Sequence, residues 1–529
     1  MMPAMTHALL FATLLALLLA AAPTQGQTTE PADDAEPVRP AQEQPDFKSM
    51  STTEHEAVGM KYRAVAAELD MKDDAGVTRG TIFFTHYFAL GDDGKPLHES
   101  EPRPITYVFN GGPGAASVWL HLGTAGPYRV DIPDDGTPPA PPSKVVENAD
   151  SWLPATDLVF IDPVGTGFSR AAIKKTDKDR DGQQDADARI EDEGSRFYGV
   201  REDIQWVGEF IRIHCTRFGR WGDAKYLAGE SYGTTRAAQL ALSLHDRYGM
   251  DVSGVILIST VLDFATIRTA ENNPMPHVSF MPTYAAIAAY HGKNDLSPEE
   301  AATQASEWAT ATYMPALLRG ATLGDEDRQS VAEQYAQFTG LPVEYVLASD
   351  LRVDPFRFMK KFLNDDRKVI GRMDGRITGY DPDPISDTPS DDPSLGGYKG
   401  VYSASFNDYI RSDLGFKSDL AYEVLSGRVQ PWNSTPESSR AYSGGYLSVA
   451  DDLQNAMNQI PGLRLFVASG YYDLATPFNG ADYTVHQMKL SPESRERIQV
   501  VYYGGGHMMY HVADERVRLG QDLRAFIAQ

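Results

Sequence analysis

The run Gly229-Glu230-Ser231-Tyr232-Gly233 constrains this chain more than any other feature. A short apolar stretch at 225–228 precedes it, and a helix-like stretch rich in Ala and Leu follows at 234–248. A sharp turn from strand to helix strains the backbone of its central serine, and small residues on either side leave the hydroxyl accessible. The pattern therefore predicts that Ser231 is a nucleophile at the end of a buried parallel strand. A buried serine in an ordinary strand-to-helix turn is the alternative.

The length and charge of the chain limit what it can be. With 529 residues it exceeds a single average domain, but one large α/β unit with an inserted subdomain accounts for that length. The formal net charge of −25 disfavours nucleic acid as a partner, because a phosphate backbone needs a concentrated cationic face. We therefore expect a globular protein with an acidic surface and no nucleic-acid partner.

The N-terminal residues have the pattern of a targeting segment. An apolar core at 8–22 is followed by Pro23 and small residues, which predicts a secretory signal peptide over 1–26. The first residues contain no Lys or Arg, so an uncleaved membrane anchor is the alternative. No later stretch reaches about 18 uninterrupted apolar residues, so we expect no stable membrane insertion after the leader is removed. The Pro-rich and acidic stretch at 27–50 predicts a disordered linker.

The cysteine content indicates the cellular compartment. Cys215 is the only cysteine, so no intramolecular disulfide can form. It lies in a helix-like stretch at 200–218, which favours a packed thiol over a nucleophile. An exported chain without disulfides is typical of a bacterial periplasmic or extracellular protein. The sequence does not determine the oligomeric state.

Strand-like and helix-like patterns alternate along most of the chain, which predicts a mostly parallel sheet with helices on both faces. Between 262 and 443 helical patterns dominate instead. We therefore predict an α/β core in two parts, 51–261 and 444–529, with a helical cap inserted at 262–443 over the carboxyl edge of the sheet. The strand candidates are 78–90, 105–109, 157–161, 226–228, 254–259, 463–468 and 498–502.

A serine nucleophile needs a base and an orienting acid, and both follow late strands of this chain. In this fold class the order along the chain is serine, acid, histidine. Asp473 follows the strand candidate at 463–468, and His507 follows the last strand candidate and three glycines. We predict that His507 accepts the proton of Ser231 and that Asp473 orients the imidazole. His511 lies four residues on, but no glutamate follows the first histidine as in zinc peptidases, so we expect no metal and no cofactor.

The oxyanion hole is predicted from a second glycine-rich turn. The strand candidate at 105–109 is followed by Asn110-Gly111-Gly112-Pro113-Gly114, whose glycines let backbone amides approach a tetrahedral intermediate. The N–H groups of Gly112 and Tyr232 are the predicted donors. A glycine-rich turn without a chemical role is the alternative.

Four motifs follow one another along the chain, at residues 110–114, 162–169, 229–233 and 506–508. Together they resemble the serine carboxypeptidases, the S10 peptidases of α/β-hydrolase fold. The resemblance implies that fold and the triad of Ser231, Asp473 and His507. It also implies that Asn110, Gly111 and Glu230 bind the free C-terminal carboxylate of a peptide substrate. Glu230 can do so only as a protonated acid, since two carboxylates in contact must share a proton, which implies activity in acid.

Two departures from the family pattern leave alternatives open. Thr124 stands where the family often has a second glutamate, which puts carboxylate binding in doubt and shifts the expected pH optimum towards neutral. An esterase or acyltransferase with the same triad, or a non-catalytic envelope binding protein, are the alternative functions. The run Asp177–Asp185 begins like a calcium-binding EF-hand loop but has Ala188 at the twelfth position, so a solvated acidic insertion is the favoured interpretation.

Overall fold

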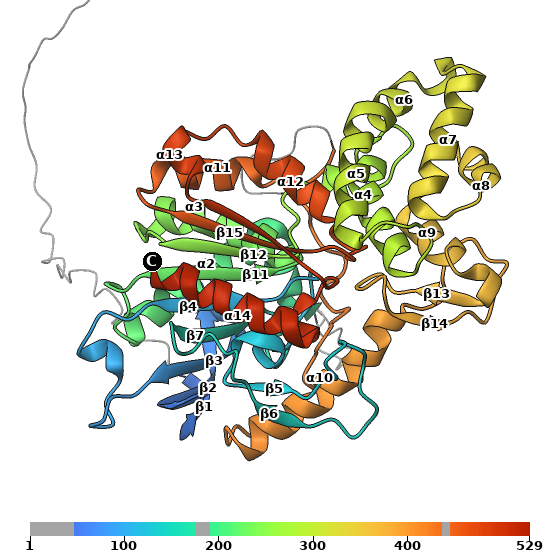
Figure 1. The fold of residues 1–529 in the computed structure, drawn as a ribbon. Coiled ribbons are helices and arrows are strands. Elements are labelled where there is room, and N and C mark those ends of the chain that lie inside the picture. The colour runs from blue at the N-terminus through green and yellow to red at the C-terminus, as the bar shows by residue number, and fades with distance from the viewer. Residues whose placement is uncertain (1–46, 175–190, 436–444) are drawn as a thin grey trace, which may run out of the picture. The chain divides into compact units, whose positions relative to one another are not determined.

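The computed structural model describes residues 47–174, 191–435 and 445–529, all of which belong to one compact unit, Pro45–Gln529 (Figure 1). The predicted signal peptide at 1–26, most of the predicted linker and the acidic run at 177–185 lie outside the described residues. Within the described ranges, no helix is long and apolar enough to cross a membrane.

A ten-stranded sheet forms the centre of the fold, in the order β1-β2-β3-β7-β4-β11-β12-β15-β16, with β8 paired to β3. The pairings from β1 to β7 are antiparallel, and those from β7 to β16 are parallel. This is the predicted α/β-hydrolase architecture, with chemistry expected at the carboxyl edge of the parallel strands. The strands are β1 (Phe47–Ala57), β2 (Met60–Lys72), β3 (Thr78–Ala89), β4 (Ile105–Phe109), β7 (Asp157–Asp162), β8 (Arg170–Ala171), β11 (Lys225–Glu230), β12 (Gly254–Ile258), β15 (Arg464–Gly470) and β16 (Ile498–Tyr503).

The first two strands differ from the sequence prediction. β1 begins at Phe47, so the linker predicted to extend to residue 50 is wrong over its last four residues. Side chains of β1 alternate between half-buried and exposed, as on an edge strand with few large apolar residues. β2 contains many helix formers, including three alanines and a leucine, yet it pairs with strands on both sides. Tertiary pairing decides its conformation, because β propensity depends on context.

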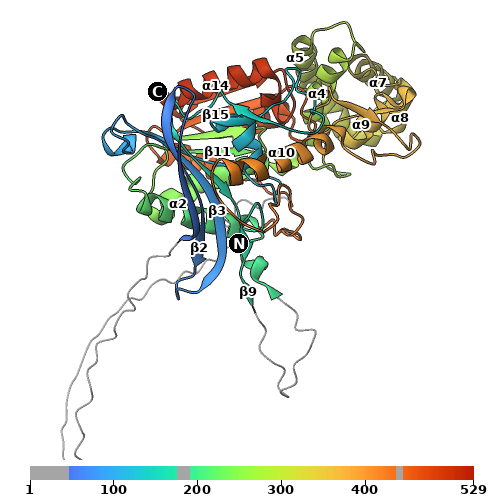
Figure 2. The same ribbon diagram turned by 90° about the horizontal axis from the view of Figure 1, so that it is seen from below.

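Helices cover both faces of the sheet (Figures 1 and 2). On one face, Leu519 and Leu523 of α14 pack on the strands, and on the other Val207 of α2 and Leu240 of α3 do so. The only cysteine, Cys215, is buried in α2. The helices of these layers are α2 (Val200–Arg217), α3 (Tyr232–Tyr248), α11 (Ala450–Gln459), α12 (Phe478–Gln487), α13 (Pro492–Arg495) and α14 (Ala513–Ala528).

Most of the predicted insertion forms a helical cap with its own hydrophobic core, built around buried aromatic residues such as Tyr284, Trp308 and Phe358. In Figure 1 these helices gather beyond one end of the sheet. The cap elements are α4 (Met275–Tyr290), α5 (Pro298–Trp308), α6 (Met314–Arg319), α7 (Asp325–Thr339), α8 (Val343–Ala348), α9 (Pro355–Lys361), β13 (Lys368–Ile370) and β14 (Thr378–Tyr380).

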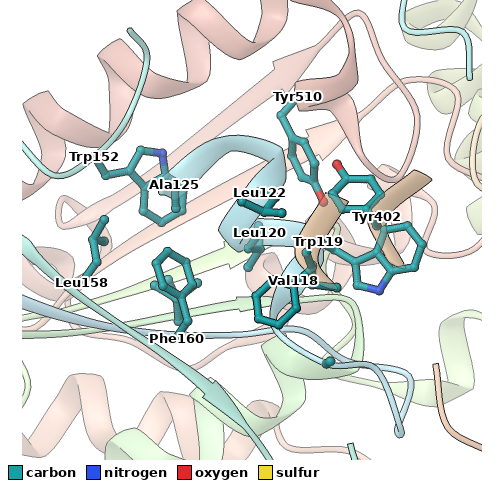
Figure 3. Close-up of a cluster of buried hydrophobic side chains, with 14 of the residues drawn as sticks. Val118, Trp119, Leu120, Leu122, Ala125, Trp152, Leu158, Phe160, Tyr402 and Tyr510 are labelled. Carbon is teal, nitrogen blue, oxygen red and sulfur yellow. The ribbon is translucent and has the colours of Figure 1, made fainter. Parts of the chain in front are cut away.

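The last part of that insertion packs on the α/β core instead of the cap. Tyr402 and Phe406 of α10 (Pro393–Ser412) join the cluster that contains Trp119 and Phe160, residues of the core (Figure 3). α10 therefore belongs to the wall of the core. The remaining short helices and strands are α1 (Val118–Leu120), β5 (Tyr128–Val130), β6 (Val145–Glu147), β9 (Ile173–Lys174) and β10 (Glu191–Asp192).

A buried ionic cluster anchors the amino end of the parallel strands. Asp157, at the start of β7, is fully buried and accepts hydrogen bonds from Arg103 Nε at 2.7 Å and Arg220 Nη1 at 2.7 Å. The backbone N–H of Ala89 donates to the same carboxylate at 3.0 Å. Because every charge in the cluster is buried and paired, loss of one partner would leave an uncompensated charge.

Candidate active site

Ser231 occupies the strained turn that the sequence predicts. It follows the last residue of β11 and precedes the first residue of α3, with φ 59° and ψ −127°. A positive φ is unfavourable for a residue with a side chain and is held only where the surrounding structure imposes it. The turn is also tight, because a Cβ on Gly229 would lie 2.0 Å from the carbonyl oxygen of Gly233. Glycine at 229 is therefore a requirement of the backbone path.

Asp473 and His507 lie on the loops after β15 and β16 and contact each other directly. The Nδ1–H of His507 donates to Asp473 Oδ2 at 2.7 Å, and both side chains are buried. Asp473 Oδ1 accepts from the backbone N–H of Ala475 at 2.7 Å and of Thr476 at 3.0 Å. The hydroxyl of Thr476 donates to Asp473 Oδ2 at 2.7 Å. The carboxylate is thus fixed from several directions, and its bond to Nδ1 leaves Nε2 as the basic nitrogen of the imidazole.

Two further contacts hold the backbone of His507. Its N–H donates to the carbonyl oxygen of Met373 at 2.5 Å, and the Ser259 hydroxyl donates to its carbonyl oxygen at 2.6 Å. Burial lowers the pKa of His507, but the charge and hydrogen bond of Asp473 raise it, and the net pKa lies above the usual value of 6.5. The base is therefore oriented by the acid and by main-chain contacts together.

One cavity of about 470 Å³ brings the predicted site residues together. Among the described residues, the Gly112 N–H donates to no backbone or side-chain group, and the same holds for the Tyr232 N–H at the start of α3. The two amides are close in the fold, because a Cβ on the intervening Gly111 would lie 2.4 Å from Tyr232 N. Free amides next to a serine are the donors that an oxyanion needs. The predicted site residues that line the cavity are Asn110, Gly111, Gly112, Glu230, Ser231, Tyr232 and His507, whereas Asp473 lies behind His507.

Glu230, immediately before the serine, is a buried carboxyl group. The hydroxyl of Tyr510 donates to its Oε2 at 2.7 Å. Burial raises the pKa of Glu230 to about 7, although the positive charge of His507 and the hydrogen bonds of Tyr510 and Asn110 lower it. Asn110 is fixed in turn, since its Oδ1 accepts from the Leu120 N–H at 3.1 Å. Glu230 therefore carries a proton in weak acid and loses it near neutrality.

Thr124, at the position where the family often has a second glutamate, makes no polar contact with the site. Thr124 is buried in a single π-helical turn, His121–Ala125, and its hydroxyl has no hydrogen-bond partner among the described residues. The group that contacts Glu230 instead is the phenol of Tyr510, which lies with Tyr402 and Trp119 (Figure 3). This carboxyl group is thus paired with a neutral donor, not with a second acid.

Sequence reasoning missed Tyr510, Ser259 and Arg372. Tyr510 reaches Glu230 from 280 positions away, and no local pattern marks it. Ser259 has a positive φ of 53° at the end of β12, which only the backbone reveals. The signal for the Asp473 loop is in the sequence: a threonine three residues after an aspartate at a strand end is typical of a side chain that caps its own turn.

Among the described residues, no three His, Cys, Asp or Glu side chains come together in a way that could hold a metal ion. The second histidine of the C-terminal motif, His511, is engaged otherwise. Its Nε2 lies 2.8 Å from the Tyr402 hydroxyl, and burial lowers its pKa to about 3, so it remains neutral.

Comparison with known proteins gives one family. The model of the family described as "Serine carboxypeptidase" matches residues 84–270, which include the oxyanion loop and Ser231. The "Serine carboxypeptidase-like 35" protein of Arabidopsis thaliana is 24% identical over 409 residues, 75% of this chain and 71% of that protein. These matches support the serine carboxypeptidase family.

Other serine carboxypeptidase relatives match over shorter stretches. A pheromone-processing carboxypeptidase of Meyerozyma guilliermondii is 42% identical over 85 residues, which are 16% of this chain and 11% of that protein. The chain spans only about a tenth to a third of the length of most curated relatives that it matches. A solved thermophilic esterase from Thermogutta terrifontis is 12% identical, with a TM-score of 0.32, over 87% of this chain and 97% of its own. The strand order and the serine turn are the features that define the α/β-hydrolase fold of this chain.

Proposed function

We propose that this protein is a serine carboxypeptidase that releases C-terminal amino acids from peptides through an acyl-enzyme. The observation that carries the proposal is Glu230, a buried acid with a pKa of about 7 next to the strained Ser231. A protonated carboxyl group and the Asn110 amide are donors that suit a terminal carboxylate. Recognition of a free terminal carboxylate is what distinguishes a carboxypeptidase from an enzyme for internal peptide bonds or simple esters.

The proposed reaction uses the same imidazole in acylation and in deacylation. Nε2 of His507 takes the proton of Ser231 as Oγ attacks the carbonyl carbon of the last peptide bond. The amides of Gly112 and Tyr232 donate to the developing oxyanion. His507 then protonates the leaving amine of the terminal residue, which departs. Water, activated by the same imidazole, hydrolyses the acyl-enzyme and restores the serine.

The proposal includes a pH dependence whose sign follows from the site. The base must be neutral, and Asp473 raises the pKa of His507 above 6.5, so activity falls as the pH drops below that pKa. Glu230 must be protonated to donate a hydrogen bond to a substrate carboxylate, so activity falls as the pH rises above about 7. An optimum close to neutral pH follows.

The decisive experiment compares three substrates with the same blocked dipeptide body. One ends in a free acid, one in an amide and one in a simple ester, and kcat/KM is measured for each by mass spectrometry. A carboxypeptidase prefers the free acid over the amide strongly below pH 7, and the preference shrinks above it. Equal cleavage of acid and amide would contradict recognition of a terminal carboxylate.

Thr124 favours a second candidate, an esterase or acyltransferase that uses the same triad. With no second carboxyl group beside Glu230, terminal-carboxylate recognition rests on fewer groups. Under this alternative the ester is the best of the three substrates and the free acid has no advantage. A non-catalytic envelope binding protein is tested separately by a fluorophosphonate probe, which labels the folded protein at Ser231 if the nucleophile is active. Labelling that persists in Ser231→Ala would refute the assignment of the nucleophile.

We also propose that the protein is a bacterial enzyme exported to the periplasm or the cell exterior. The apolar stretch at 8–22 and the single cysteine support export without disulfides. N-terminal sequencing of the full chain expressed in a bacterial host tests this. Cleavage near residue 26 and recovery outside the cytoplasm are expected, and an intact N-terminus in the membrane fraction would favour an anchor.

A further inference from the structure

The cavity that holds the serine has a charge opposite to that of the chain. The formal net charge is −25, yet the wall of the cavity contains two arginines and only one carboxyl group. That carboxyl group is Glu230, which is neutral below about pH 7. The arginines are Arg268 and Arg372, from two segments on the cap side of the cavity. A positive site inside an acidic protein is a feature that a binding function explains.

Arg372 is held firmly by its backbone. Its N–H donates to Asp392 Oδ1 at 3.0 Å, and its carbonyl oxygen accepts from the N–H of Leu474 at 3.0 Å. Leu474 directly follows Asp473, so the position of Arg372 is linked to the loop of the orienting acid. The next residue, Met373, accepts the N–H of His507. The backbone of Arg372 is therefore as well ordered as the catalytic loops.

The guanidinium of Arg372, in contrast, has no ion-pair or hydrogen-bond partner among the described residues. It lies over the ring of Phe356, with Cζ 5.8 Å from the ring centroid. Burial lowers the pKa of Arg372, the charges of Asp473 and Asp392 raise it only in part, and the charge of Arg268 lowers it further. A planar cation with free N–H donors that already faces an aromatic ring is suited to a carboxylate.

Arg268 repeats the arrangement. It follows the 3₁₀ turn Phe264–Thr266, and its Cζ lies 5.8 Å from the ring centroid of Phe264. It is exposed, and no ion pair or hydrogen bond of its guanidinium occurs among the described residues. Both arginines thus present free donors to the same cavity, and each guanidinium lies over an aromatic ring.

We propose that Arg372 and Arg268 bind an acidic side chain of the substrate, so that the enzyme prefers peptides with Glu or Asp as the last or penultimate residue. The inference rests on the proposed carboxypeptidase function. The terminal carboxylate is assigned to Asn110, which follows β4, and to Glu230, the last residue of β11. The arginines come from other segments, and they are therefore available for a second carboxylate.

The test uses N-terminally blocked peptides of one sequence that carry Glu, Gln or Lys at the last or at the penultimate position. The release of the final residue gives kcat/KM for each peptide. A hydrogen-bonded charge contributes enough free energy for a preference of at least about tenfold for Glu over Gln at one of the two positions. The position with the preference identifies which substrate side chain the arginines receive.

Variants then connect the preference to the arginines. Arg372→Gln reduces the ratio of Glu to Gln towards one, and Arg372→Glu makes the Lys peptide the better substrate. Arg357→Gln is the matched control. Arg357 follows Phe356 in α9, pairs with Asp354 at 3.6 Å and does not line the cavity. It keeps the wild-type ratio. The Gln peptide serves as the internal reference for folding in every variant.

The outcomes separate this inference from the function on which it rests. Release of residues with no difference between Glu and Gln overturns the inference and leaves the carboxypeptidase intact. A loss in Arg372→Gln by the same factor for all peptides also overturns it, since Arg372 would then serve the terminal carboxylate or the fold. If no peptide loses its last residue, both the function and the inference are wrong.

Discussion

Replacement of Glu230 by glutamine gives the sharpest test of the site, because it fixes as neutral a group whose charge we expect to change near pH 7. The glutamine keeps an oxygen that can accept from Tyr510 and an amide that can donate to a substrate carboxylate. Only the titration is lost. Any change in pH dependence between wild type and variant therefore reports the protonation of this one carboxyl group.

The magnitude for stability follows from the pKa. Glu230 has a pKa of about 7 in the folded protein, against 4.5 for an exposed glutamate, a difference that corresponds to about 3 kcal/mol. Because the folded pKa is the higher one, the folded state holds an extra proton between these values. Its stabilising effect is fully present below pH 4.5 and is lost as the pH rises through about 7. Between about pH 4 and pH 8, wild type should lose about 3 kcal/mol more unfolding free energy than Glu230→Gln.

The magnitude for activity follows from the same value. Above about pH 7 the protonated fraction falls about tenfold per pH unit, so wild-type kcat/KM for a free-acid peptide falls about 100-fold by about pH 9. Glu230→Gln lacks this alkaline limb and keeps the acid limb that His507 produces. Urea unfolding across the pH range and initial rates with a blocked dipeptide measure the two effects.

A control variant and the contradicting results complete this prediction. Glu333→Gln makes the same chemical change at an exposed site on α7, and it should leave both pH profiles unaltered. If Glu230→Gln retains the alkaline limb, Glu230 is not the group that must be protonated. If its stability has the same pH dependence as wild type, Glu230 is not a buried acid with a raised pKa.

Three other substitutions test separate parts of the structure. Tyr510→Phe removes a bond that favours the Glu230 carboxylate, so the alkaline limb of kcat/KM should move up by about one pH unit, and a downward move would contradict the geometry. Gly229→Ala places a Cβ against the carbonyl of Gly233, and it should abolish fluorophosphonate labelling and destabilise the protein by at least about 2 kcal/mol; normal labelling would refute the tight turn. Asp157→Asn leaves the buried Arg103 without a carboxylate partner and Arg220 with Asp223 alone, and it should lower the free energy of unfolding by about 3–5 kcal/mol, with kcat of the folded fraction unchanged; a loss under about 1 kcal/mol, measured by urea unfolding, would show that the cluster is dispensable.

The parts of the fold that the sequence predicts are those with local signals. Each parallel strand is a short apolar run. Every strand predicted from such a run is present, and both of its ends lie within two residues of the predicted ones. β2 was not predicted, because Met60–Lys72 has the composition of a helix and becomes a strand only through pairing on both sides. β1 has the weak alternation of an edge strand, and nothing local distinguishes it from the linker before it.

The chemistry divides in the same way. Ser231, Asp473 and His507 were predicted because each follows a strand in a known order, and the structure brings Asp473 and His507 to 2.7 Å and places Ser231 and His507 on one cavity. Tyr510 and Arg372 were not predicted. Tyr510 contacts Glu230, 280 positions away, and Arg372 is held by Leu474 on the acid loop, and such contacts exist only after packing.

The segment that follows β13 explains why the insertion cannot be regarded as a removable lid. Arg372 accepts the N–H of Leu474 on the acid loop, Met373 accepts the N–H of His507, and the N–H of Gly375 donates to Tyr472. These three contacts tie the insertion to both loops that carry the base and its acid. Because the same segment presents the guanidinium of Arg372 to the cavity, a change that repositions it for a new substrate also moves the support of the base. Substrate preference and catalytic geometry are for this reason expected to vary together in this chain.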